Sequence, residues 1–307
     1  MAAGDDPSWL RIEVPRALAG TRFDRVLAKL VPGRSGAQLQ KLVRRGGVKV
    51  DGKKVVRSNF AVRGGESITL RLSEPAEPAV ELDYLHVDED VAVVAKPAGM
   101  MTHPTERYRG GSVSELAVQR FGPLPSISGP EERWGIVHRL DRETSGVLVL
   151  ARTPEALDRL RNQFRARTVD KVYLALVYGA PDEESFDVEL ALGPAPGQRD
   201  LQRVDPAGRA SFTSFRVLGR GERLALVECR PRTGRRHQIR VHLWAKGHPI
   251  VGDKLYRPQG GVERIRGLPH HALHAERLAF DHPRTGERLE LRAPLPDGLQ
   301  RYADRLV

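Results

Sequence analysis

The stretch HRLDRETSG, residues 138–146, gathers an imidazole, two guanidinium groups, two carboxylates and two hydroxyls. It lies between the apolar runs GIV (135–137) and VLVLA (147–151), so we predict a turn between two strands. An aspartate in a turn is more often an ion-pair anchor than a catalyst. Asp141 therefore needs basic partners, and a second segment, RPRTGRRHQIRVH at 230–242, offers several.

Other chemistries lack their usual residues. The sequence has no phosphate-binding G-x-x-x-x-G-K-[ST] loop, no dinucleotide-type G-x-G-x-x-G after a strand and no G-x-S-x-G elbow. The pairs His237 and His242, and His270 and His274, favour polar packing over a metal site. The single cysteine, Cys229, permits no intramolecular disulfide and is predicted to be buried. We expect no cofactor and no metal.

The positive charge of the chain is concentrated near one end. The formal net charge is +11, and residues 11–72 hold 15 Lys and Arg against four Asp and Glu, whereas residues 73–307 hold 35 against 33. This asymmetry indicates a surface for a polyanion, and nucleic acid fits better than a membrane because no amphipathic anchor accompanies it. The alternative is a solvated basic face without a partner.

The basic segment has a readable order of elements. We predict one helix behind a Thr21 cap, a second behind a Ser35 cap, two strands joined by a DG turn at 51–52, and a strand at 67–72. Several cations fall on the second helix and the hairpin, where they can follow phosphates. They are Arg34, Lys41, Arg44, Arg45, Lys49, Lys53 and Lys54.

This segment resembles the alpha-L RNA-binding motif, a module first described in a small-subunit ribosomal protein. The matching residues are R-F-D-x-x-L, R-S-x-A-Q and G-x-V-x-V-D-G-K. The resemblance implies RNA docking without chemistry. We accordingly divide the chain into an N-terminal extension (1–20), a small α/β RNA-binding domain (21–72), a Glu- and Pro-rich linker (73–82) and a catalytic domain (83–307).

The larger domain interleaves strands and helices without a strict βαβ period. Two short strands ending at Lys96, a helix at 154–167 and a helix ending at Gly247 stand among strand-like runs, including HALHAERLAF at 271–280. The expected fold class is α+β with a mixed, mostly antiparallel sheet. No apolar stretch reaches the length of a membrane span, and the start does not read as a signal peptide, so we expect a soluble, cytoplasmic protein.

HRLDRETSG also resembles the catalytic motif H-R-L-D-x-x-T-S-G of the RluA family of pseudouridine synthases. Further signatures of that family follow in the expected order: KPAGMMTHP (96–104), KVYLALVYG (171–179), RTGRRHQIRVHL with GHPIVGD (232–253) and LHAERLAFDHP (273–283). The departures, ERYRGGSV and PLPSISGPEER, lie outside these motifs. They leave the choice of substrate open, not the type of reaction.

The resemblance implies a role for each motif residue. Asp141 would be the essential carboxylate, acting as nucleophile, as stabiliser of an oxocarbenium-like centre, or as base toward a glycal intermediate. A motif arginine would pair with it, and Arg235 is our first choice and Arg240 our second. Tyr173 would stack on the uracil and help remove the proton from the ring carbon. These roles make Asp141, Tyr173 and Arg235 the predicted catalytic residues.

The resemblance also implies substrate contacts. His138 and Arg139 would fill the gap left by a flipped uridine or contact the backbone, Lys96 would shape the floor of the site, and the TSG residues would hold the turn. We expect an RNA partner, with ribosomal RNA, of the large subunit in particular, favoured over transfer RNA, and a monomer.

Two rival functions belong to other classes. A non-catalytic RNA-binding or ribosome-associated factor of the same fold would use residues 11–72 alone. An N-glycoside hydrolase would use Asp141 as nucleophile and would need a second carboxylic acid, for which Glu143 is the nearest candidate.

Overall fold

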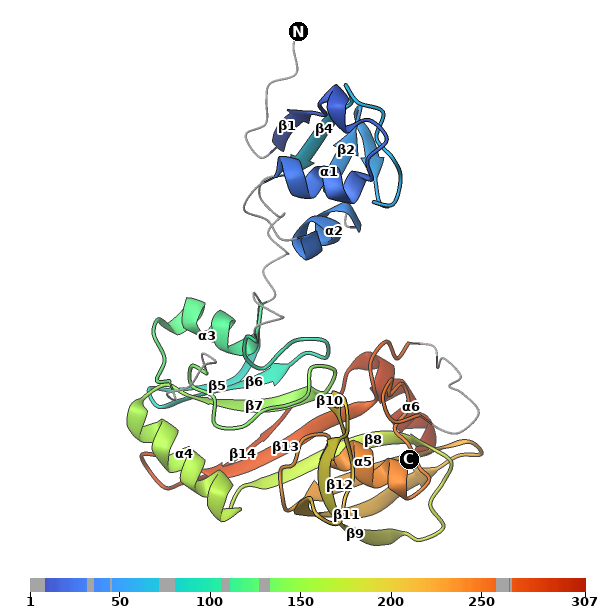
Figure 1. Ribbon diagram of the computed structural model, residues 1–307. Coiled ribbons are helices and arrows are strands. Elements are labelled where there is room, and N and C mark those ends of the chain that lie inside the picture. Colours follow the sequence, from blue (N-terminus) through green and yellow to red (C-terminus); the bar gives the residue numbers. More distant parts are fainter. Residues whose placement is uncertain are drawn as a thin grey trace. The chain divides into compact units, whose positions relative to one another are not determined.

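A computed structural model describes residues 9–31, 36–44, 46–71, 81–105, 111–126, 133–257, 265 and 267–307, without the side chains of residues 37, 38, 41, 44, 71 and 199. The chain divides into two compact units, Met1–Val80 and Glu81–Val307, each drawn in Figure 1. Each unit has its own apolar core, and we describe them one at a time. Among the described helices, none combines the length and apolarity that a bilayer crossing requires.

The N-terminal unit packs two helices on a four-stranded antiparallel sheet of order β1-β4-β2-β3. Phe23 and Leu27 of the first helix and Leu42 of the second are buried against Ile68 and Leu70 of the sheet. The elements are β1 (Trp9–Glu13), η1 (Arg16–Leu18), α1 (Phe23–Leu30), α2 (Gly36–Arg44), β2 (Val48–Val50), β3 (Lys53–Val55) and β4 (Ser67–Arg71).

Two expectations for this unit are corrected. Residues 9–20 are not an extension, because β1 alternates Leu10 and Ile12 toward the core and pairs with β4. Thr21 does not cap α1, since Arg22 occupies the N-cap position without a side-chain cap. The DG turn is confirmed, with positive φ at both of its residues as a tight hairpin requires. The predicted Ser35 cap lies outside the described residues.

The second unit is built on a ten-stranded sheet of order β10-β9-β11-β12-β8-β13-β7-β6-β5, with β14 beside β13 (Figure 1). Of the strand pairs described, β13 with β7 is the parallel one, so the expected mixed, mostly antiparallel α+β fold is confirmed. The elements are β5 (Asp83–Val87), β6 (Val91–Lys96), α3 (Val113–Phe121), β7 (Ser145–Ala151), α4 (Pro154–Ala166), β8 (Asp170–Tyr178), β9 (Ser185–Ala195), β10 (Gln198–Val204), β11 (Arg209–Arg220), β12 (Leu224–Pro231), α5 (Gln238–Ala245), β13 (Leu273–Asp281), β14 (Arg288–Arg292) and α6 (Asp297–Leu306).

Strand β7 is buried on both faces, which explains its unbroken apolar run VLVLA. Leu148 and Leu150 belong to the core beneath α3, whereas Val147 and Val149 belong to the core beneath α4. The preceding GIV run is not a strand as expected, because only a single bridge joins Ile136 to β7. The polar motif is therefore a loop packed on β7.

Candidate active site

The loop that carries Asp141 is fastened to the loop that follows β6. Gly99 donates its N–H to the carbonyl of Arg142 at 2.8 Å, and the Arg142 Nε donates back to the carbonyl of Gly99 at 3.0 Å. Nearby, the Thr102 hydroxyl donates to the carbonyl of Leu140 at 3.0 Å. These contacts bracket Asp141 on both sides, so the backbone at this position is held without a regular element.

Lys96 joins the same two loops from inside. Its side chain is 1% exposed, and its Nζ donates to the carbonyls of Pro97 (3.0 Å), Met100 (2.9 Å) and Arg142 (3.2 Å). Burial lowers the pKa of Lys96 to about 7, and the charge of Asp141 opposes that shift. The ammonium of Lys96 is bound to backbone carbonyls, and its role in shaping the floor of the site stays a prediction.

The TSG residues, Thr144 to Gly146, fasten the turn to strand β13 and to the residues just before it. Thr144 Oγ1 lies 2.7 Å from His271 Nε2, and Ser145 Oγ lies 2.8 Å from His274 Nδ1. Gly146 has a φ of +119°, and a Cβ there would lie 2.1 Å from the carbonyl oxygen of Ala275. Only glycine fits this close parallel pairing of β7 and β13.

Arg240, and not Arg235, forms the ion pair with Asp141. The Arg240 Nη1 lies 2.9 Å from Asp141 Oδ2, while its Nε and Nη2 bind Asp253 Oδ2 and Oδ1 at 2.6 and 2.9 Å. Arg235 precedes α5 and donates its Nε to the carbonyl of Ala210 at 3.1 Å. The order of our two choices was wrong, because helix α5 turns Arg240 into the interior and leaves Arg235 half-exposed.

His237 is a second neighbour of Asp141 that the sequence analysis did not assign to the site. Its Nε2 lies 3.8 Å from Asp141 Oδ2, and its Nδ1 lies 2.9 Å from the hydroxyl of Tyr256. Asp253 also accepts the backbone N–H of Tyr256 at 3.1 Å. Asp253 is the last residue of the GHPIVGD motif, which gave it no individual role, and Tyr256 lies three residues beyond that motif.

The surroundings keep Asp141 ionised. Burial by itself would raise its pKa, but the neighbouring His237, Arg240 and His271 outweigh burial and hold the pKa below the ordinary value of 3.8. Burial lowers the pKa of His237 and of His271 to about 4. Both imidazoles are therefore neutral at neutral pH, and Arg240 is the fixed positive charge beside the carboxylate.

Tyr173 lies on β8, an inner strand of the sheet. Its Cα is paired with Cys229 of β12 on one side and with Ala275 of β13 on the other. Burial, followed by the charge of Asp141, raises its pKa above the ordinary value of 10.0. Asp141 is therefore near enough for its charge to act on the phenol, which is neutral at neutral pH.

His138 takes part in packing, and its contact with substrate stays a prediction. Its ring stacks on Phe164 of α4 with centroids 4.6 Å apart, and its Nε2 accepts the N–H of Val149 at 3.0 Å. Burial and the charge of Lys171 lower its pKa to about 3. Arg139 is exposed in the same loop, and its contact with RNA stays a prediction.

Four cations of the second unit lie near enough to act on one another, and we call them the cationic rim: Arg167, Lys171, Arg209 and Arg235. Burial, then repulsion by Arg209 and Arg167, lowers the pKa of Arg235, which places these charges near one another. Among the described residues, neither Arg167 nor Arg209 forms an ion pair with a carboxylate. Arg167 also has a φ of 63° at the end of α4, a left-handed conformation that costs a β-carbon residue about 1 kcal/mol.

The cations expected on the N-terminal unit are described only in part. Lys53 and Lys54 are exposed on β3, and Lys49 lies over the ring of Trp9 at 4.8 Å. For the other predicted cations, either the whole residue or its side chain lies outside the described part of the chain. They are Arg34, Lys41, Arg44 and Arg45.

Three of the four histidines weighed as metal ligands, His237, His242 and His274, bind protein groups through a ring nitrogen. In the described part of the chain, Nδ1 of His242 and Nδ1 of His270 have no hydrogen-bond partner. His274 binds Ser145 through Nδ1 and the carbonyl of Ala293 through Nε2 at 3.1 Å, and His242 Nε2 lies 2.8 Å from the Ser211 hydroxyl. HALHAERLAF contributes to strand β13 as predicted. The polar-packing interpretation fits these contacts.

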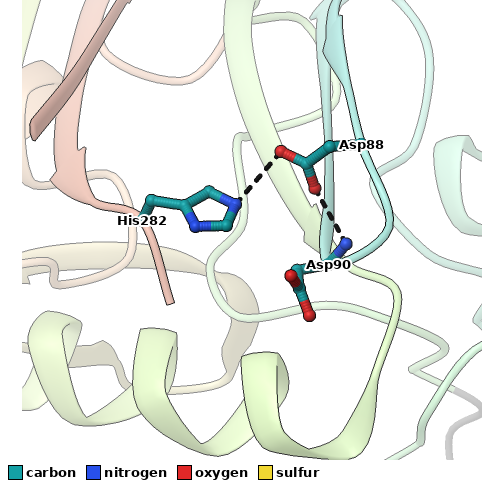
Figure 2. Close-up of side chains that lie close together, drawn as sticks. All are labelled: Asp88, Asp90 and His282. Atoms are coloured by element: carbon teal, nitrogen blue, oxygen red, sulfur yellow. Dashed lines mark hydrogen bonds and ion pairs between the residues drawn. The ribbon is translucent and has the colours of Figure 1, made fainter. Parts of the chain in front are cut away.

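A second polar cluster, formed by Asp88, Asp90 and His282, joins the β5–β6 turn to the β13–β14 turn (Figure 2). Asp88 accepts from His282 Nε2 at 3.1 Å, and the Nδ1 of His282 accepts the backbone N–H groups of Arg284 and Thr285 at 3.3 and 3.2 Å. Asp90 binds the Arg284 guanidinium through both oxygens. Because the ring nitrogens and both Asp90 oxygens already have protein partners, this cluster fastens two turns.

Comparison with known proteins fits this arrangement. Residues 90–245 match the model for RNA pseudouridylate synthase, and residues 21–68 match the S4 domain. An uncharacterized RNA pseudouridine synthase of Bacillus subtilis is 37% identical over 93% of this chain and 94% of its own. The ribosomal large subunit pseudouridine synthase D of Xanthomonas campestris is 37% identical over 98% of this chain and 93% of its own.

A solved structure, human RNA pseudouridylate synthase domain containing 1, superposes with a TM-score of 0.59 at 28% identity, over 73% of this chain and 87% of that one. The fold, the motif order and these relatives agree. The chain belongs to the RNA pseudouridine synthase family, in which it is an enzyme of the RluA type with an N-terminal S4 domain.

Proposed function

We propose that this enzyme converts uridine in large-subunit ribosomal RNA to pseudouridine, with Asp141 as the essential carboxylate and without a cofactor. The observation that carries the proposal is the ionised Asp141, which is paired with the buried Arg240 at 2.9 Å and whose charge acts on Tyr173. A carboxylate held ionised beside a neutral phenol suits a reaction at a sugar carbon with an uncharged base.

The reaction breaks the bond from the ribose C1′ to N1 of uracil and forms a bond from C1′ to C5. The base turns over between the two steps, C5 loses its proton, and N1 gains one. Ionised Asp141 can attack C1′, stabilise positive charge there, or remove a sugar proton toward a glycal. All three routes need the same anion, so the geometry supports its essential role under each.

Tyr173 is proposed to contact the uracil ring while it turns over. An aromatic ring can stack on any base, and its position beside Asp141 brings it to the reacting end of the site. Because its raised pKa keeps the phenol neutral, Tyr173 does not act as a phenolate base at neutral pH. It can pass the C5 proton only toward a second acceptor, such as Asp141 or water.

RNA contact is proposed for both units. The cationic rim can neutralise phosphates beside the flipped uridine, and the S4 domain presents exposed Lys53 and Lys54 on its hairpin. Arg139, exposed two residues before Asp141, is placed to approach the gap left by the uridine. The relative named for the ribosomal large subunit favours ribosomal RNA as the target.

The geometry does not favour the N-glycoside hydrolase. Glu143, the candidate acid, binds Lys254 at 2.6 Å. Although its partial burial acts to raise the pKa, the hydrogen bond and charge of Lys254 outweigh it and lower the pKa below 4.5. Glu143 is therefore ionised at neutral pH and poorly suited to protonate a leaving group.

The test is incubation of purified protein with large-subunit RNA transcripts in the presence of a metal chelator, followed by mapping of pseudouridine. We expect pseudouridine at one or a few uridines with the parent protein and none with Asp141→Asn. Release of free uracil would support the hydrolase instead. Absence of any pseudouridine on ribosomal and transfer RNA alike would contradict the proposed function.

A further inference from the structure

His237 is held in an unfavourable backbone conformation at the start of α5. Its φ of 57° and ψ of 17° are left-handed, and its side chain is largely buried. A residue with a β-carbon pays on the order of 1 kcal/mol here, although histidine, like asparagine, is enriched in this region among such residues. The conformation brings the ring between two partners, Asp141 and Tyr256, at 3.8 and 2.9 Å.

The hydrogen bonds around Tyr256 fix which ring nitrogen carries the proton. The backbone N–H of Gln202 donates to the Tyr256 oxygen at 2.9 Å, which leaves the hydroxyl proton free to be donated to His237 Nδ1. The neutral ring then carries its proton on Nε2, facing Asp141. The opposite tautomer would turn the Nε2 lone pair toward a carboxylate, which is repulsive.

The two groups that approach Asp141 both face the same oxygen. Arg240 Nη1 lies 2.9 Å and His237 Nε2 lies 3.8 Å from Oδ2. Within the described part of the chain, Oδ1 has no hydrogen-bond partner, and the side chain is 21% exposed. Oδ1 is therefore the oxygen that a bound ribose can reach.

We propose that His237, with its tautomer fixed by Tyr256, is a positioning residue that holds Oδ2 of Asp141 together with Arg240 and so aims Oδ1 at the ribose. This inference rests on the proposed function of Asp141. The 3.8 Å separation shortens to a hydrogen bond when substrate closes the site, because catalytic contacts tighten on binding. One loop supports both contacts, since Asp253 holds Arg240 and Tyr256 holds His237.

Two substitutions of His237 separate this role from a structural one. The amide of glutamine reaches the place of Nε2 and can donate to Asp141, whereas the shorter asparagine reaches only the place of Nδ1. Asparagine, however, suits the left-handed backbone better. If the role of His237 is purely structural, His237→Asn should therefore have the higher kcat of the two variants. If His237 positions Asp141, His237→Gln should have the higher kcat.

We expect His237→Gln to retain kcat within a few fold and His237→Asn to lose roughly ten- to a hundredfold in kcat with little change in KM. Tyr256→Phe should lower kcat in the same way, and adding it to His237→Asn should cost nothing more. The matched control is His242→Asn, on the same helix but bound to Ser211, which should leave kcat unchanged even where it lowers the melting temperature. A His237→Asn enzyme equal to or faster than His237→Gln overturns the proposal.

A measurement without turnover separates failure of this inference from failure of the proposed function. Nitrogen-15 NMR of the histidine rings should show His237 with its proton on Nε2 in the parent and a mixture of tautomers in Tyr256→Phe. A parent with the proton on Nδ1 overturns the inference whether or not pseudouridine is formed. Lack of pseudouridine with the expected tautomer instead counts against the proposed function.

Discussion

Arg240 and Asp253 form a two-bond ion pair in the interior, with the guanidinium 6% and the carboxylate 0% exposed. Removing either charge from water is costly, and the pair is tolerated because its geometry is bidentate. Arg240 has one further edge, and that edge faces Asp141. The second carboxylate thus fixes the arginine so that Asp141 receives charge from a rigid group instead of a mobile side chain.

Asp141→Asn should abolish isomerisation while leaving RNA affinity within a few fold. The amide has nearly the same shape but is neither an anion nor a nucleophile, and a loss of roughly 10²–10⁴-fold in kcat is the expected scale. Single-turnover formation of pseudouridine, with RNA binding measured in parallel, checks it. If the variant keeps about a tenth of the parent rate, Asp141 is not the essential carboxylate.

Replacing Arg240 should move the acid limb of activity to higher pH. In the parent, Asp141 has a pKa below 3.8, so kcat/KM falls only once the pH drops below that ordinary value. Burial raises the pKa of Asp141, and His237, Arg240 and His271 oppose it. Arg240→Met removes one of these charges together with its hydrogen bond, so protonation and loss of activity begin at higher pH. Profiles of kcat/KM against pH for the parent, Arg240→Lys and Arg240→Met measure where the acid limb lies in each protein.

Arg240→Lys is the control for charge. Lysine keeps the positive charge but cannot bind Asp253 with two parallel bonds and Asp141 with a third. We expect an acid limb between those of the parent and Arg240→Met, with kcat lowered in both variants. Identical acid limbs in all three proteins would show that Arg240 does not set the ionisation of Asp141.

Lys96→Met should destabilise the catalytic unit by about 1–3 kcal/mol, because it leaves the buried carbonyl of Met100 and the partly buried carbonyls of Pro97 and Arg142 without their shared donor. The loops after β6 and before β7 lose their internal link, so kcat should fall as well. Denaturant unfolding measures the first effect. Unchanged stability would mean that water replaces the ammonium at no cost.

Much of the fold follows from local patterns in the sequence. The DG hairpin, the alternation in β4, the apolar face of α4 and the buried run of β7 were each predictable from spacing alone. The sequence analysis missed β1 because WLRIE is a short pattern. Its strand partner is β4, which lies far along the chain, so no local pairing signal marks it.

The site was predictable as a set of motifs but not as a geometry. Arg235 and Arg240 stand five residues apart in one basic segment, and only the turn of α5 and the buried Asp253 decide which one meets Asp141. His138 likewise has the type of a substrate-binding residue, but its ring is taken by Phe164, which is distant in sequence. Long-range partners of this kind carry no signal in a single local pattern.

The cationic rim should contribute to the salt dependence of RNA binding. Removing one phosphate contact reduces the magnitude of the slope of log K, where K is the association constant for RNA, against the logarithm of the salt concentration by about 1. We expect this change for Arg167→Ala and for Arg209→Ala. The control is Arg216→Ala, seven positions beyond Arg209 on β11 and ion-paired with Glu228 at 3.2 Å, which should keep the parent slope. If all three variants keep the parent slope, the cationic rim does not contact RNA phosphates.

The S4 domain should determine which RNA is preferred. A second phosphate-binding surface rewards a target whose folded backbone extends beyond the flipped uridine, because the tether makes the second contact effectively intramolecular. We therefore expect a higher kcat/KM on a protein-free large-subunit RNA domain than on a transfer-RNA anticodon stem-loop.

Removal of residues 1–80 should erase most of that difference, because the catalytic unit keeps its own cores and its site but loses the second contact. Weak activity on short uridine-containing RNA should persist, since the chemistry lies entirely in the second unit. Measuring kcat/KM for both proteins on both RNAs gives the comparison. If the full-length enzyme modifies both substrates with equal efficiency, the S4 domain has no part in selection, and Asp141 keeps its assignment because its contacts lie in the other unit.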